Sequence, residues 1–171
     1  MATKRMAWDT AHYLGILSRT DNAETETIKL MGVGIKSLNR SPSPIVSESA
    51  YINDKNGSPT ITGYSNTFPV EYDDIVDDDA IAALQSVAEE QKTGIDAEFY
   101  YYRVDLTSDA TGTACRAKRY RVICNAGDET NAATQIVTAA CTLQQIGNFT
   151  SGTFNRSAEP YTFTADDAAT E

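Results

Sequence analysis

Apolar and polar residues alternate along much of this chain, a pattern that predicts β-strands with one buried face. The clearest example runs from Ile61 to Asp73, where aromatic and β-branched residues alternate with polar ones. Pro69 lies inside this run and has no N–H to donate, which places the strand near an edge or a bulge. Further strands are expected at residues 27–38, 97–106, 114–124, 133–146 and 152–164, with a strand or extended loop at 45–52.

One segment follows a helical period instead. Ile81, Leu84 and Val87 recur every three residues and form one apolar stripe. Three aspartates, at residues 77–79, precede the stripe, where a carboxylate can cap the helix and meet the positive end of its dipole. Gly94 suits the other end as a C-terminal cap. The sequence therefore predicts a helix over about residues 78–92.

The order of these elements predicts a single domain of the mainly β class. About six or seven strands accompany one helix, with turn signals at intervals typical of a sandwich. We therefore expect a β-sandwich or barrel-like protomer with one flanking α-helix, formed by residues 27–147. Residues 1–26 are expected to be an N-terminal arm that docks on its own domain or on a neighbour, and residues 148–171 a C-terminal segment.

The composition is globular, with an acidic balance. Of the 171 residues, 41% are hydrophobic and 22% charged, and the formal net charge is −10. Phosphates repel such a chain, so simple nucleic-acid binding is disfavoured. No run reaches the roughly eighteen apolar residues of a membrane helix, and the N-terminus lacks the apolar core of a signal peptide. We therefore expect a protein with no membrane contact that stays in the cytosol unless something carries it out.

The residues that usually carry enzyme chemistry are scarce. The three cysteines (Cys115, Cys124 and Cys141) are widely spaced, which suits neither a disulfide framework nor a zinc site. His12 is the single histidine and has no nucleophile motif nearby, so a structural or surface role is expected. Phosphate-binding, dinucleotide-binding and zinc-protease motifs are missing. We therefore expect no catalytic residue, no metal and no cofactor.

Charge is segregated along the chain. Residues 66–98 hold ten acidic side chains against a single lysine, a net −9, whereas residues 99–125 sum to +3. The acidic cluster from Glu71 to Asp79 has three interpretations. The cluster does not have the residue spacing of a calcium-binding loop, which disfavours a cation site. No particular pair of carboxylates stands out as a candidate for glycoside hydrolysis. A helix cap with a solvated acidic surface is favoured.

The basic strand presents charge on both faces. By alternation, Arg116 and Lys118 share a face with Tyr120, whereas Arg119 and Arg121 share the other with Ala117. One face of a strand in a monomeric sandwich must be core, so charge on both faces indicates a subunit contact with the acidic segment of a neighbour. The candidate interface residues are Arg116, Lys118, Arg119 and Arg121.

Several local strings occur in an order shared with one known family. They are residues 28–34 (IKLMGVG), 48–52 (ESAYI), 60–65 (TITGYS), the aromatic-proline strand 68–72 (FPVEY) before an acidic turn and the helix, 152–155 (GTFN) and 161–166 (YTFTAD). On these strings the chain resembles the major tail tube proteins of long-tailed bacteriophages. The resemblance covers roughly residues 27–166.

The resemblance implies a structural virion protein that assembles in the host cytoplasm. In this family, six protomers join their sheets into a ring with a continuous inner β-barrel, and stacked rings form a hollow tube through which double-stranded DNA leaves the capsid. Besides the chain itself, the implied partners are the tape measure protein, the tail terminator and the tail tip proteins. The terminal segments and a long loop help join ring to ring, which here correspond to residues 1–26, about 39–60 and about 148–171.

Site residues follow from this resemblance together with the residue pattern. Glu71 and Asp73 lie on the polar face of the alternating strand, so these residues and Asp74 are candidates for the tube lumen. The ring-stacking candidates are Trp8, Tyr13, Tyr51, Phe154 and Tyr161. Three alternatives remain at this point: a secreted or surface β-sandwich adhesion module, the inner tube of a contractile tail or phage-derived bacteriocin, and a carboxylate-based hydrolase.

Overall fold

The computed structural model describes residues 4–20, 23–49, 52 and 57–166, which form a mainly β fold with one α-helix. The strands are β1 (Thr10–Thr20), β2 (Ala23–Leu30), β3 (Ile35–Leu38), β4 (Ser41–Ser49), β5 (Ser58–Asp73), β6 (Glu98–Asp105), β7 (Cys115–Thr130), β8 (Thr138–Gln145), β9 (Thr150–Asn155) and β10 (Thr162–Ala165). The helices are α1 (Asp79–Glu89) and the short 3-10 turns η1 (Ala7–Asp9) and η2 (Gly94–Ala97). The expected fold class, mainly β with one helix, is confirmed.

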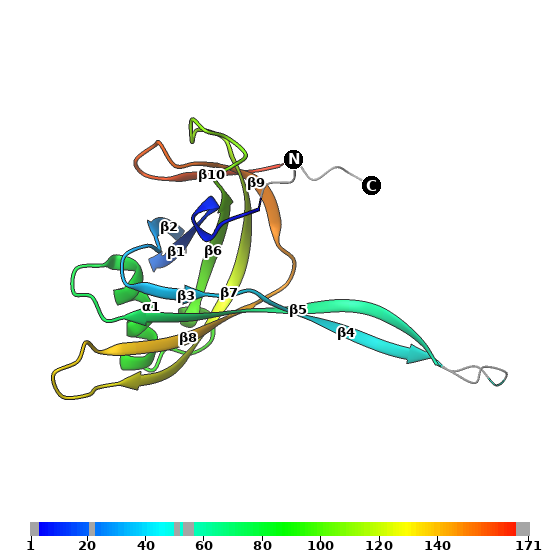
Figure 1. The fold of residues 1–171 in the computed structure, drawn as a ribbon, viewed down its shortest axis with the longest axis horizontal. Coiled ribbons are helices and arrows are strands. Elements are labelled where there is room, and N and C mark those ends of the chain that lie inside the picture. Colours follow the sequence, from blue (N-terminus) through cyan, green and yellow to red (C-terminus); the bar gives the residue numbers. More distant parts are fainter. Residues whose placement is uncertain (1–3, 21–22, 50–51, 53–56, 167–171) are drawn as a thin grey trace.

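The strands form one antiparallel sheet that forks at its longest central strand (Figure 1). The main path runs β2-β1-β6-β7-β8-β5-β3. Along one edge, β7 pairs first with β9 over residues 115–119 and then with β8 over residues 122–130. Because β10 pairs with β9, the fork adds a second small layer beside the main sheet. This arrangement gives the sandwich-like character that the turn spacing predicts.

Two apolar cores lie on opposite faces of the sheet. Neighbouring residues in a strand point to opposite faces, so Tyr101 enters the first core and Tyr102 the second. The first core lies under α1, whose Ile81, Leu84 and Val87 are buried. The second core includes Phe154 from β9, and Phe163 of β10 packs against it. Both faces of the central strands are therefore covered.

The predicted helix is present, and its predicted cap is in place. The Asp78 carboxylate accepts hydrogen bonds from the backbone N–H groups of Ala80 and Ile81, both at 3.0 Å. Such a cap stabilises a helix by about 1 kcal/mol. The helix ends at Glu89, earlier than expected, because Gln91 adopts a left-handed φ of 51° and turns the chain towards β6.

The expected N-terminal arm is wrong for residues 10–20 and 23–26, which belong to the sheet. β1 lies between β2 and β6, and its Leu14 is fully buried. Because Tyr13 and Leu14 enter the two cores from opposite faces, β1 lacks the alternation that marks a half-buried strand. The expected strand at 27–38 is also divided, since Gly34 at φ 79° makes a turn between β2 and β3.

One hairpin projects far from the body of the molecule (Figure 1). It consists of β4 and residues 58–65 of β5, and we call it the projecting hairpin. In the described part of the chain, β4 pairs with β5 alone. Every residue of β4 is exposed, so the segment that the sequence left as strand or extended loop is a strand without a core.

Candidate assembly surfaces

The projecting hairpin has an apolar face that the protomer does not bury. Val46 pairs directly with Ile61, and Pro44 pairs with Tyr64 on the same face. The exposed fractions are 50% for Val46, 55% for Ile61 and 59% for Tyr64. A bulge between the two pairs adds Thr62, whose hydroxyl donates to the Ile45 carbonyl at 3.1 Å and holds the register. The opposite face is mostly serine and threonine.

Such a hairpin indicates a binding surface. A two-stranded hairpin is marginally stable in water unless its apolar face packs on something. Exposed apolar groups at successive paired positions, on an edge strand with free N–H and C=O groups, favour contact with another chain. The hairpin therefore has both the side chains and the backbone groups of an intermolecular contact.

The acidic residues predicted to face a lumen share one open sheet face. Glu71 and Asp73 alternate with the buried Val70 and Tyr72, and so lie on the face opposite α1. Glu71 is exposed and accepts a hydrogen bond from the Ser37 hydroxyl at 3.3 Å, while Lys36 pairs with Asp73 at 2.6 Å. Asp74 follows the strand and is half-buried. The shared face of Glu71 and Asp73 is as expected, and their position in a lumen stays a prediction.

The structure explains the charge on both faces of β7 within one protomer. Cys115 and Ala117 enter the second core, whereas Tyr120 and Val122 enter the first. Residues 117 and 120 point to opposite faces of the sheet, so the buried face of β7 changes between them. On each side of this change, the charged residues lie on the face opposite the buried one. Charge on both faces of β7 therefore does not require a subunit contact, and the prediction of an interface on that ground is wrong.

Two of the four basic candidates already have partners in the protomer. The Arg121 guanidinium donates to the Glu98 carboxylate at 2.9 Å through its Nε. The guanidinium of Arg119 lies over the rings of Tyr100 and Phe163, at 4.8 and 5.2 Å from their centroids. Arg116 and Lys118 are both exposed, on the opposite face.

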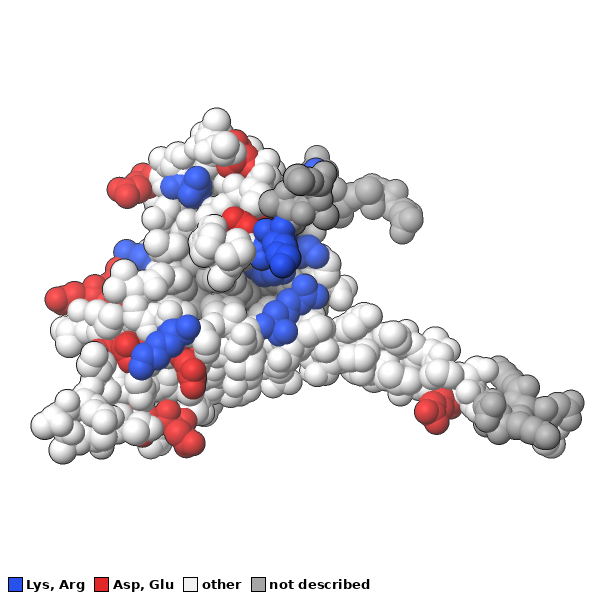
Figure 2. Space-filling model, in the orientation of Figure 1, with Lys and Arg blue, Asp and Glu red and all other residues white. Residues whose placement is uncertain are grey.

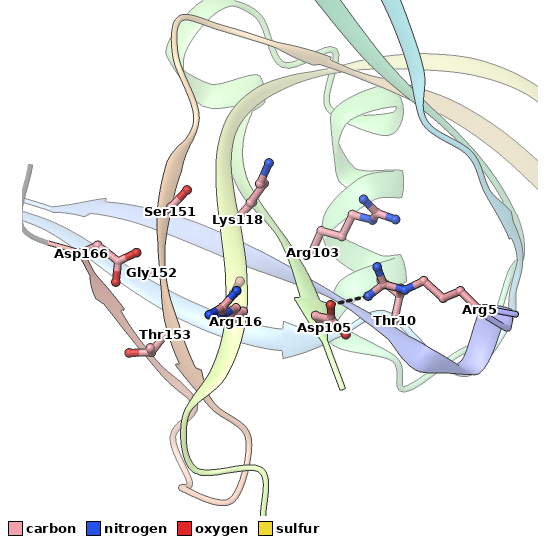
Figure 3. A pocket seen from close by; sticks show the side chains of 11 residues that line it. Arg5, Thr10, Arg103, Asp105, Arg116, Lys118, Ser151, Gly152, Thr153 and Asp166 are labelled. Carbon is pink, nitrogen blue, oxygen red and sulfur yellow. Dashed lines mark ion pairs between the residues drawn. The ribbon is translucent and has the colours of Figure 1, made fainter. Parts of the chain in front are cut away.

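Arg116 and Lys118 line a hollow of about 640 Å³ (Figure 3), which we call the basic hollow. Strand register brings its polar side chains into two rows across β6, β7 and β9. One row is Asp105, Arg116 and Thr153, and the other is Arg103, Lys118 and Ser151. Arg5 and Asp166 complete the charged lining, and Arg5 pairs with Asp105 at 2.6 Å. Four cationic side chains thus face two carboxylates.

Arg103 and Arg5 were not among the residues predicted from the sequence. Arg103 follows a run of aromatic residues and carries no motif of its own. Its significance comes from its cross-strand neighbour Lys118, which lies fifteen positions away in the sequence. Alternation along β6 is the one indication available in the sequence, because it places Arg103 and Asp105 on the same face of the strand.

His12 lies beside the hollow, on the next strand from Arg103. Its Nδ1 is 2.7 Å from the Tyr101 hydroxyl, which is itself fully buried in the first core. Burial, and secondarily the positive charge of Arg103, lowers the pKa of His12 to about 4. The imidazole is therefore neutral at pH 7 and serves the packing of β1, in line with the structural role expected.

We expect His12 to make stability depend on pH between about 6.5 and 4. In this window the unfolded chain binds a proton that the folded protein does not, so the free energy of unfolding falls as pH drops. A depression of this size is worth on the order of 2–3 kcal/mol. Urea unfolding of the wild type and His12→Gln at pH 7 and pH 4.5 should show a smaller loss in the variant. Equal losses in the two proteins would contradict the assignment.

Two ring-stacking candidates are core residues, and their predicted role is wrong. Tyr13 is 4% exposed and Phe154 is not exposed, with their ring centroids 4.5 Å apart in the second core. Neither side chain can contact another ring of subunits while the core is closed. Trp8, on η1, is 71% exposed, and Tyr161 is half-buried against Tyr13. Both stay predictions, and Tyr51 lies outside the described residues.

Other chemistry is limited in the part of the chain that the structure describes. Within it, no group of three or more histidine, cysteine or carboxylate side chains could hold a metal ion. The three cysteines are buried and unpaired. No helix in the described ranges has the length and hydrophobicity to cross a membrane.

Comparison of the sequence with family models gives no match, and no curated protein matches the chain. Solved structures do match. The SPP1 tail tube aligns with 85% of this chain and 77% of its own, at 14% identity and a TM-score of 0.61. The tail of an empty gene transfer agent particle with C6 symmetry aligns over 85% and 97%, at 8% identity and 0.57. The sheath/tube terminator of an extracellular contractile injection system aligns over 88% and 97%, at 8% identity and 0.52. The chain shares their fold.

Proposed function

We propose that this chain, which has the fold found in tail tubes, is a structural subunit that polymerises as stacked hexameric rings into a hollow phage tail tube. The observation that carries the proposal is the match of 85% of the chain to the SPP1 tail tube. The sixfold symmetry of the gene transfer agent tail supports the ring of six. In this proposal the tube is the conduit through which double-stranded DNA is ejected into the host.

The exposed edges and the projecting hairpin support self-assembly. In the described residues, β4 leaves a long edge unpaired, and β2 and β3 end the main path of the sheet. Natural β proteins close or cover such edges, because open edges invite uncontrolled pairing. Joining the sheets of neighbouring protomers around a closed ring satisfies the edges of every subunit at once. The hairpin then reaches a neighbouring subunit and buries Val46, Ile61 and Tyr64.

The open sheet face is proposed to line the lumen. Its acidic members Glu71 and Asp73, with Asp74 beside them, give a wall that repels phosphates and does not hold the passing DNA. A structure of the assembled protein should place at least one of these carboxylates at the inner surface. All three on the outer wall would refute this part of the proposal.

The remaining partners follow from the role of a tail tube. We propose that the tape measure protein occupies the lumen during assembly and that terminator and tip proteins bind the two ends. The location is the virion tail, after assembly in the host cytoplasm. The match to a contractile injection system keeps one second candidate, an inner tube surrounded by a sheath.

Negative-stain microscopy of the purified protein, over a series of concentrations, tests the proposal. Rings or hollow tubes are expected. A protein that remains monomeric at high concentration would contradict tube formation, and binding to a glycan array would then favour the adhesion alternative. Co-purification with a sheath protein would distinguish a contractile tail from a long flexible one.

A further inference from the structure

We propose that the basic hollow receives carboxylates from the C-terminal end of α1 of a neighbouring copy of this chain. The donor groups are Glu89, the last residue of α1, and Asp96 of η2, and we call them the acidic helix end. The inference rests on the proposed ring assembly and names the charged contact within it. The contact predicted from the sequence used four residues of β7, whereas the contact proposed here uses the residues that line the basic hollow.

The hollow holds more positive charge than its own carboxylates neutralise. Arg5 and Asp105 form one ion pair, and the rest of the lining has one carboxylate, Asp166, against three cations. Lys118 lies over the ring of Phe149, at 4.4 Å from its centroid, which orients the ammonium without neutralising it. Among the described residues, Arg103 and Arg116 form no ion pair. The hollow is therefore a ready acceptor of negative charge.

The shape of the hollow suits a protein segment. A volume of about 640 Å³ is much larger than one small anion, which would contact only part of the lining. Ser151 and Thr153 add hydroxyl donors along one wall, and three of the four cationic side chains stand on the adjacent strands β6 and β7 (Figure 3). Several carboxylates on one short segment can therefore be bound together, each by a guanidinium or an ammonium group.

The acidic helix end offers carboxylates that the protomer leaves exposed. The carboxylates before α1 are already used, since Asp78 caps the helix and Asp79 pairs with Lys29 at 2.6 Å. In contrast, Glu89 and Asp96 are exposed and have no ion pair within the described ranges. The C-terminal end of α1 is the negative end of the helix dipole, and it adds to the negative electrostatic potential of these carboxylates.

The positions of the two signs of charge suit a ring. Figure 2 shows a group of basic side chains near the middle of one face and most of the acidic side chains towards its left and lower margins, with some basic ones among them. A contact between the hollow of one copy and the acidic helix end of the next is head-to-tail, and such a contact closes into a ring when the rotation permits. Each subunit then contributes one hollow and one acidic helix end.

Charge reversal in the hollow is the first arm of the test. The double variant Arg103→Glu/Arg116→Glu should raise the concentration needed for tube formation about ten- to hundredfold, as sedimentation would measure. Arg156→Glu is a control for charge reversal elsewhere on the surface, because Arg156 is exposed and lies outside the hollow. Circular dichroism and thermal unfolding establish that each protomer is folded. If the double variant is unfolded, the neutral pair Arg103→Gln/Arg116→Gln replaces it, with a smaller loss expected.

A charge swap is the second arm. The variant Glu89→Lys/Asp96→Lys alone should raise the concentration needed for tube formation to a similar extent. An equal mixture of the two double variants should form tubes at a lower concentration than either alone, because in alternating order each hollow meets an opposite charge. Wild-type tubes with normal assembly of either double variant would overturn this inference while leaving the tube function intact. A wild-type protein that forms no rings or tubes would instead contradict the proposed function itself.

Discussion

Replacing Val46 and Ile61 by aspartate should abolish tube formation at concentrations where the wild type assembles, without unfolding the protomer. These two residues face each other on the apolar side of the projecting hairpin and are half exposed in the protomer. In the proposed tube they are buried against another subunit. The variant loses that apolar burial and must also desolvate two carboxylates at the contact.

The expected size of the effect follows from the buried surface. Fully burying a side chain of this size contributes about 1.5–3 kcal/mol, and every 1.4 kcal/mol changes an association constant about tenfold. Because both side chains are already about half buried in the protomer, their loss should raise the critical concentration for assembly about 10- to 100-fold, and desolvation of the two carboxylates adds to this. Sedimentation across a concentration series, with negative-stain images of the pellets, measures this change.

The hairpin also supplies a matched control. Ser47 and Thr60 form the next pair along the same strands and lie on the opposite, polar face. Ser47→Asp/Thr60→Asp adds the same charge to the same hairpin and should change assembly much less. An equal loss of assembly in both double variants would indicate a general effect of charge. Normal assembly of Val46→Asp/Ile61→Asp would show that the apolar face of the hairpin makes no contact needed for the tube.

Phe154→Ala should destabilise the protomer by about 3–5 kcal/mol, the usual cost of truncating a fully buried phenylalanine. Phe154 has no exposed surface, and its ring centroid is 4.5 Å from Tyr13 and 5.7 Å from Tyr102. Its removal leaves a cavity between β9 and the main sheet. Urea unfolding of the unassembled protein would measure the loss directly.

The same measurement tests the corrected role of this aromatic residue. Trp8→Ala is the control, because Trp8 is largely exposed and its removal should leave protomer stability within about 0.5 kcal/mol. If Phe154→Ala were as stable as the wild type but failed to form tubes, the residue would be a ring-stacking contact after all, and the second core would be wrongly described.

The elements that the sequence predicted well are those with one buried face. α1 has an apolar stripe on one side and an aspartate cap, and the second half of β5 alternates between the first core and the open face. β1 escaped prediction because Tyr13 and Leu14 are buried on opposite sides of the sheet, which removes any two-residue period. Strands at the centre of two cores do not carry that signal.

The assembly surfaces were predictable only in part. The shared face of Glu71 and Asp73 follows from alternation within one strand. The basic hollow depends on pairing between β6, β7 and β9, which no local pattern specifies, and the change of buried face along β7 depends on where the sheet forks. The amphipathic hairpin could not be predicted from the sequence for two reasons. Two prolines in β4 disfavour a strand, and the bulge at Thr62 shifts the alternation by one residue.

Cryo-electron microscopy of the assembly formed by the purified protein is the decisive test of the proposed tube. We expect a hollow tube of sixfold rings in which the projecting hairpin of each subunit packs its Val46–Ile61 face on a neighbouring subunit. A protein that stays monomeric at every concentration, or an assembly in which that face remains exposed to solvent, would contradict it.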